Sequence, residues 1–160
     1  MIDHTPPAAR AKAKAAEHKR FFAQVKKQDH RLVDDTVHAL HEEVFEETDC
    51  LQCGNCCRTT SPLFIDADID RLARHLRMSP GDFTRTYLRV DEDGDYVFKA
   101  PPCPFLGHDN YCSVYEARPR ACREYPHTDR KRFQQVLDLT LKNAAICPAV
   151  FEIIERWRQL

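Results

Sequence analysis

The chain has little glycine, and the glycines it has are scattered. Its four glycines are Gly54, Gly81, Gly94 and Gly107, and no two of them lie close together. Walker-type phosphate loops and GxGxxG dinucleotide turns need closely spaced glycines, because the backbone must approach the phosphates. The sequence therefore excludes both of these nucleotide-binding motifs.

Long apolar runs and an excess of one charge are missing too. No run approaches the ~18 apolar residues of a membrane-spanning helix, and the first residues lack the apolar core of a secretory signal. The 24 basic and 25 acidic residues nearly cancel, so strong non-specific binding to nucleic acid is not expected. We expect a cytoplasmic protein with no membrane partner, and nucleic acid is not an expected partner.

The residues before the first cysteine are typical of helix. Between Ala8 and Cys50 there is neither glycine nor proline, and alanine, lysine, glutamate, leucine and valine dominate. The pattern predicts one long helix or a helical hairpin that breaks near residues 28–30. An apolar stripe at helical spacing follows the break and is formed by Val33, Val37, Leu40 and Val44.

From residue 50 onward the predicted elements are shorter. They are a strand at 62–65, an amphipathic helix at 66–78, a helix beginning at Ser79-Pro80, a strand at 96–98, a segment of helical periodicity at 130–141 and a last helix opened by Pro148. The predicted fold class is mainly α with minor short strands. We expect an N-terminal helical extension over residues 1–49. A small metal-stabilised cysteine-cluster domain with a C-terminal helix is expected over residues 50–160.

The strongest signal is the cysteine content. Cytoplasmic thiols are kept reduced, so a dense set of cysteines favours metal binding over disulfides. Four cysteines fall between Cys50 and Cys57, where CxxC spacing lets two thiolates curl around one ion and Gly54 permits a tight turn. All eight cysteines are candidate metal ligands: Cys50, Cys53, Cys56, Cys57, Cys103, Cys112, Cys122 and Cys147.

The number and the order of the cysteines bear on how many metal centres there are. Eight thiolates can form two four-thiolate sites, or one [4Fe-4S] cluster and one zinc site, so one or two metal centres are expected. The side chains of Cys56 and Cys57 diverge, so we expect them to serve different metals or different corners of one cluster. Thiolate sets suit both zinc and iron, and the sequence leaves that choice open.

The cysteine motifs resemble a known family. The pattern CxxCGxCC at Cys50–Cys57, then CPFL from Cys103, YEARPRACR from Tyr115 and a late Cys147-Pro148 are similar to the YkgJ-type cysteine-cluster (CxxCxxCC) family. The resemblance implies a zinc- or iron-chelating domain that uses eight cysteines. It also places Arg118 and Arg123 inside the motif, where we expect them to balance thiolate charge.

Two further functions stay open beside simple metal binding. Flagellin lysine methylases use a similar cysteine motif, and this resemblance implies an enzyme with an iron–sulfur cluster that transfers a methyl group; an oxidoreductase is a related alternative. The other alternative is a structural zinc module whose N-terminal helices bind a protein partner. His38, His41 and His108 are expected to be solvated or turn residues and not ligands.

Overall fold

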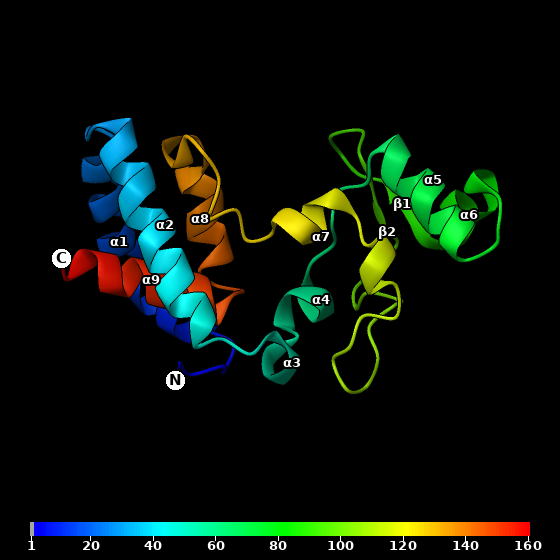
Figure 1. Ribbon diagram of the computed structural model, residues 1–160, viewed down its shortest axis with the longest axis horizontal. Helices are drawn as coiled ribbons and strands as arrows, with labels where there is room; N and C mark the ends of the chain where they lie inside the picture. The colour runs from blue at the N-terminus through cyan, green and yellow to red at the C-terminus, as the bar shows by residue number, and fades with distance from the viewer. Residues whose placement is uncertain (1) are drawn as a thin grey trace. The chain divides into compact units, whose positions relative to one another are not determined.

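The structure is a computed structural model that describes residues 2–160, and it divides into two compact units (Figure 1). The first unit combines the chain up to Cys53 with the segment Pro126–Leu160, and the second unit is Gly54–Tyr125. In the described residues the regular structure is nine α-helices, two 3-10 helices and one two-stranded antiparallel sheet. This confirms the mainly helical fold class.

The first unit is built from helices alone. Its elements are α1 (Ala8–Val25), α2 (His30–Glu46), α3 (Cys50–Cys53), the 3-10 helix η2 (Phe133–Val136), α8 (Leu137–Asn143) and α9 (Pro148–Arg158). Helix α9 packs against α2, and α1 packs against α8 and α9 (Figure 1).

The break between α1 and α2 has a local cause. Asp29 precedes α2 with an extended backbone, and its carboxylate accepts the N–H groups of Arg31 and Leu32, each at 3.1 Å. Such an N-cap satisfies N–H groups that a helix leaves open at its start. The hairpin is therefore confirmed, and a single long helix is wrong.

The core of the first unit joins both chain segments. The predicted apolar stripe of α2 is buried, as are Val150, Ile154 and Trp157 on α9. The Trp157 ring lies edge-on to the ring of Phe21, with centroids 5.5 Å apart. Aromatic pairs favour this geometry.

The segment 130–141 does not form the continuous helix that its periodicity suggests. Asp34 on α2 accepts the backbone N–H groups of Arg132 and Phe133, at 2.8 Å and 2.9 Å. Arg132 has a left-handed backbone with φ 55°, so the helix cannot run through it. A 3-10 turn follows, and α8 begins only at Leu137.

The second unit is mixed. Its elements are α4 (Asn55–Thr59), α5 (Asp66–His75), α6 (Pro80–Tyr87), β1 (Leu88–Val90), β2 (Tyr96–Phe98), the 3-10 helix η1 (Tyr115–Ala117) and α7 (Arg120–Glu124). Ser79 caps α6 by accepting the Asp82 N–H at 3.1 Å, and Pro80 takes the first helical position. The predicted start of this helix is confirmed.

A small sheet and an aromatic cluster organise this unit. β1 and β2 pair with Leu88 opposite Phe98, which confirms the strand at 96–98. The strand expected at 62–65 is reduced to one bridge between Phe64 and Tyr96, because Pro62 has no N–H to donate to a ladder. Aromatic and aliphatic side chains fill the core and are Phe64, Ile69, Leu72, Ala73, Phe83, Leu88, Phe98, Phe105, Val114 and Ala117.

Throughout residues 2–160, each helix is too short or too polar to cross a lipid bilayer.

Candidate metal centre

The four cysteines from Cys50 to Cys57 are carried by two very short helices, α3 and α4. Asp49 precedes α3, and its carboxylate accepts the Leu51 N–H at 3.0 Å, which starts the turn. Cys53 ends α3 and is buried. Gly54 follows with a left-handed backbone at φ 58°, and α4 then begins at Asn55. The glycine adopts this left-handed backbone at little cost, and it ends α3 before α4 begins.

Within the second unit, the backbone brings distant cysteines close to Cys57. The Cys103 N–H donates to the carbonyl of Cys57 at 2.8 Å. Leu106, three residues after Cys103, forms a β-bridge with Cys112. Cys103 and Cys112 also pack against the aromatic core of this unit. Three cysteines that are far apart in the sequence therefore share one region.

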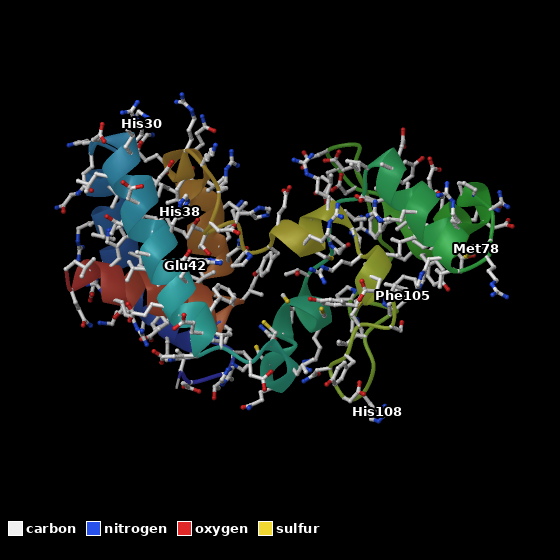
Figure 2. All side chains as sticks on the ribbon, viewed as in Figure 1. His30, His38, Glu42, Met78, Phe105 and His108 are labelled. Carbon is white, nitrogen blue, oxygen red and sulfur yellow. The ribbon has the colours of Figure 1, made fainter. Side chains whose placement is uncertain are left out.

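A tight loop between Cys103 and Cys112 makes this arrangement possible. The Gly107 N–H donates to the Tyr111 carbonyl at 2.8 Å, and the Asn110 N–H donates to the Gly107 carbonyl at 3.0 Å. A β-carbon at Gly107 would lie 2.6 Å from a carboxylate oxygen of Asp109 and 3.3 Å from the Tyr111 carbonyl, so a larger residue would push the Asp109 side chain aside. His108 lies at the exposed tip of the loop, directed away from the rest of the unit (Figure 2).

Asn110 connects this loop to α4. Its side-chain oxygen accepts a hydrogen bond from the Arg58 guanidinium at 2.6 Å. A β-carbon at Gly54 would lie 2.7 Å from that same oxygen. Two features therefore favour glycine at position 54: its positive φ and the close approach of the Asn110 side chain. This contact holds the segment of Cys57 against the segment of Cys112.

The thiols of the second unit influence one another. Burial raises the pKa of Cys103 to about 11, and the thiols of Cys57 and Cys112 add to this rise. Surrounding protein atoms raise the pKa of Cys122 to about 12, and the thiols of Cys57, Cys103 and Cys112 raise it as well. The residue as a whole is nevertheless exposed. The pKa of Cys112 is raised by burial and then by Cys57. These mutual effects require that the four sulfur atoms lie near each other.

Two arginines lie beside this group of thiols. A hydrogen bond from Cys56 lowers the pKa of Cys57 to about 7, with a further contribution from Arg58. Arg118 lowers the pKa of Cys112 against the larger effect of burial. The Arg118 guanidinium is 3.8 Å from the centre of the Tyr115 ring, which holds it in place.

In the first unit, Cys147 lies near the cysteines of α3. Burial raises the pKa of Cys147 to about 11, and the thiols of Cys50 and Cys53 add to the rise. Cys147 directly precedes α9, and the N–H groups of Ala149 and Val150 donate towards its sulfur and lower the pKa. Helix N-termini favour a thiolate in this way.

The structure thus gathers the predicted ligands into two groups. Cys57, Cys103, Cys112 and Cys122 form one group in the second unit, which we call the four-thiol group. The three-thiol group in the first unit consists of Cys50, Cys53 and Cys147. In residues 2–160, no three His, Cys, Asp or Glu side chains already converge as ligands of one ion. Metal binding would have to draw the sulfur atoms closer.

Two histidines of α2, His38 and His41, form hydrogen bonds with residues before η2. His38 Nε2 is 2.8 Å from the Arg130 carbonyl, and His41 Nδ1 is 2.7 Å from the Thr128 hydroxyl. Figure 2 shows His38 on the length of α2 between His30 and Glu42. The expectation that both are merely solvated is wrong, because each binds the segment that leads into η2.

Sequence reasoning missed two residues that shape this region. The first is Asn110, and nothing in the sequence indicates that its side-chain amide reaches Arg58. Asp68 lies on the apolar side of α5 and is completely buried. An acid three residues into an amphipathic helix is a signal for capping, and it could have been found.

The cysteine motifs match a known family. A family model named CxxCxxCC, with the description "Putative zinc- or iron-chelating domain", matches residues 49–147, which is more than half of the 160 residues. The chain belongs to this family. The CxxCxxCC match spans all eight cysteines and confirms the resemblance seen in the motifs. No curated protein and no solved structure matches the chain.

Proposed function

We propose that this CxxCxxCC protein binds zinc or iron through its cysteine thiolates, in the cytoplasm. The observation that carries the proposal is the four-thiol group. Two of its members lie on the short helices α4 and α7, and the other two lie at the ends of the loop between Cys103 and Cys112. They meet in one region although up to 65 residues separate them. Four reduced thiols gain nothing from such crowding on their own, since the neighbouring thiols of the group raise the pKa of Cys103 and Cys122.

A bound cation would reverse the electrostatics of this group. Zinc and iron bind the thiolate form, so a metal lowers the pKa of each ligand and releases protons as it binds. Four thiolates and one divalent ion together carry a net charge of minus two. Arg58 and Arg118, which lie beside the group, have the charge to balance them. The donor set and its surroundings therefore fit a four-thiolate centre.

The three-thiol group is proposed as part of a second centre. The N–H groups at the start of α9 already favour thiolate at Cys147, which is the form that a metal takes up. Cys56 and Cys57 are proposed to serve different centres or different corners of one cluster, because neighbouring side chains point apart. A hydrogen bond between their thiols does not require a shared metal.

Metal content is the direct test. Protein made without an affinity-tag metal and purified without oxygen should contain zinc or iron near one or two equivalents per chain. A visible absorption spectrum separates the two metals, because an iron–sulfur cluster is coloured and zinc is not. Folded, metal-free protein with eight titratable thiols would contradict the proposal.

Cysteine variants test the division into groups. Cys57→Ser should lose metal from the four-thiol group and leave the metal held near Cys147. Cys147→Ser should do the reverse, and Cys56→Ser should differ from Cys57→Ser in amount or spectrum. Identical partial losses in Cys56→Ser and Cys57→Ser would mean that the two residues share one site.

A second candidate function is a cluster-dependent enzyme, such as a methyl transferase or an oxidoreductase. The three-thiol group favours it, because a centre with three protein ligands keeps a position for a substrate, whereas four thiolates close the coordination of zinc. Addition of a small ligand such as cyanide to metal-loaded protein tests this candidate. An open centre should change its spectrum, and two closed centres should not.

A further inference from the structure

One buried acid in the second unit has more hydrogen bonds than its helix needs. The Asp68 side chain is fully buried near the start of α5. Its carboxylate accepts the N–H of Ile65 at 3.1 Å, which is half of a capping box. It also accepts the Arg120 N–H at 3.0 Å and the Arg71 guanidinium at 2.8 Å. Capping α5 requires only the first of these bonds.

The partner arginine extends the same contact. Arg71 donates to the carbonyl of Arg118 at 2.9 Å through Nη2 and to the carbonyl of Ala117 at 3.3 Å through Nε. Asp68 and Arg71 therefore bind the backbone on both sides of Pro119. Arg120 is the first residue of α7, so its bond to Asp68 fixes the start of that helix.

Helix α7 contributes no buried residue to the core of the second unit. It is five residues long and none of its residues is buried, although Ala117 and Pro119 just before it are. Helices of this length are unstable alone and take their position from tertiary contacts. Cys122 lies in this helix and its N–H donates to the Pro119 carbonyl at 3.0 Å. The position of the Cys122 thiol thus depends on how the Arg118–Arg120 backbone is held.

We infer that the Asp68–Arg71 pair is a positioning device for metal binding, which sets Cys122 and Arg118 against the other thiols of the four-thiol group. The inference rests on the proposed metal function. Neither residue contacts the metal; both act through the backbone of α7. On metal binding, the thiols of Cys57, Cys103 and Cys112 would close around a Cys122 thiol that the Asp68–Arg71 pair already holds in place through the backbone of α7. Partners that orient metal ligands typically change metal affinity by roughly 10–100-fold.

The test uses the full chain loaded with Co²⁺, whose absorption reports thiolate ligands, and with Zn²⁺ for affinity. Asp68→Asn removes the charge and weakens the bond to the Arg120 N–H. Arg71→Lys keeps a cation for Asp68 but loses the fork that reaches two carbonyls. In both variants the thiolate-to-Co²⁺ absorption should correspond to one thiolate ligand fewer. Their Zn²⁺ affinity should be lower by roughly 10–100-fold. Asp70→Asn is the matched control, because Asp70 is an exposed acid on the same helix, and it should behave as the wild type.

A double-variant cycle separates positioning from a general structural role. In a Cys122→Ser background, Asp68→Asn should change Zn²⁺ affinity by less than about twofold, since the thiol through which it acts is gone. A loss as large as in the wild-type background would overturn the inference. So would a wild-type Co²⁺ spectrum in both Asp68→Asn and Arg71→Lys.

Failure of the proposed function looks different. In that case the wild type itself would show no thiolate-to-Co²⁺ absorption, whatever residue 68 is. Hydrogen exchange of the β1–β2 sheet in the metal-loaded variants identifies any loss of folding. If Asp68→Asn unfolds the sheet, Arg71→Lys decides the question, and a wild-type spectrum in that variant overturns the inference.

Discussion

The two units hold themselves together in different ways. The first unit has fifteen residues in one buried cluster, drawn from helices of up to eighteen residues, whereas the cluster of the second unit has ten. Outside α5 and α6, the second unit consists of very short helices, three-residue strands and loops. Buried apolar area stabilises in proportion to its size. From this difference we predict that side-chain packing is sufficient for the first unit, and that the second unit depends on metal bound by its thiols.

Metal removal should affect the two units most unequally. Structural zinc contributes on the order of 10–16 kcal/mol in small peptides, which is comparable with the roughly 5–15 kcal/mol stability of a domain. Chelator with a reductant should therefore remove hydrogen-exchange protection from residues 54–125 first, while α1, α2 and α9 keep theirs. Full protection of residues 54–125 after verified metal loss would show that packing holds both units.

A core truncation should produce the opposite pattern. Ile154 is fully buried on α9 in the core of the first unit, and Ile154→Ala leaves a cavity there. The variant should lose about 2–5 kcal/mol of unfolding free energy in that unit, measured by urea denaturation followed through Trp157 fluorescence. Its metal content should equal that of the wild type. An equal loss of metal would mean that the two units are not independent in stability.

A glycine pair tests the thiol loops more finely. Gly54 and Gly94 both have positive φ, at 58° and 82°, but only Gly54 has atoms of Asn110 close to where a β-carbon would lie. Gly94→Ala should cost about 1 kcal/mol from backbone strain alone. Gly54→Ala should cost more and weaken metal binding, because Asn110 and Arg58 must move. Thermal unfolding and Zn²⁺ titration of both variants check this, and equal behaviour would contradict the role given to Asn110.

In metal-free protein, Glu155 should give the first unit part of its sensitivity to acid. Burial raises the pKa of Glu155. Hydrogen bonds from His18 and Arg158 lower that pKa by more than burial raises it, so the pKa lies below the usual 4.5. A lowered carboxyl pKa stabilises the fold above the unfolded-state pKa, and this contribution is lost as pH falls below about 4.5. Glu155→Gln should therefore flatten the acid side of the curve of Tm against pH for the first unit. An unchanged curve would mean that these bonds contribute no net stability.

The sequence predicted those parts that depend on neighbours along the chain. Asp29 and Ser79 mark helix starts by local capping, and the strand at 96–98 follows from its residues. The turn at Arg132 could not be predicted, because Asp34 on another helix imposes it. Strand β1 was missed, since residues 88–90 are a strand only through pairing with β2.

The same limit applies to the candidate centre. All eight cysteines were identified as candidate ligands from their number, their spacing and the family resemblance, and their ligand roles and the domain boundary at residue 50 remain predictions. Their division into groups was not predictable, because it depends on the loop at Gly107 and on contacts such as Arg58 with Asn110. The positioning pair was also hidden, since Asp68 meets Arg120 across 52 residues.

The first unit is made from two separate stretches of chain, with the whole second unit between them. On the ribosome, α1 and α2 therefore emerge long before α8 and α9 can cover their apolar faces. The second unit leaves the ribosome before the segment Pro126–Leu160 does. Contacts between segments so distant in sequence form slowly, and uncovered apolar helices invite aggregation in the interval. The order of synthesis thus leaves the apolar faces of α1 and α2 uncovered until the last residues of the chain have emerged.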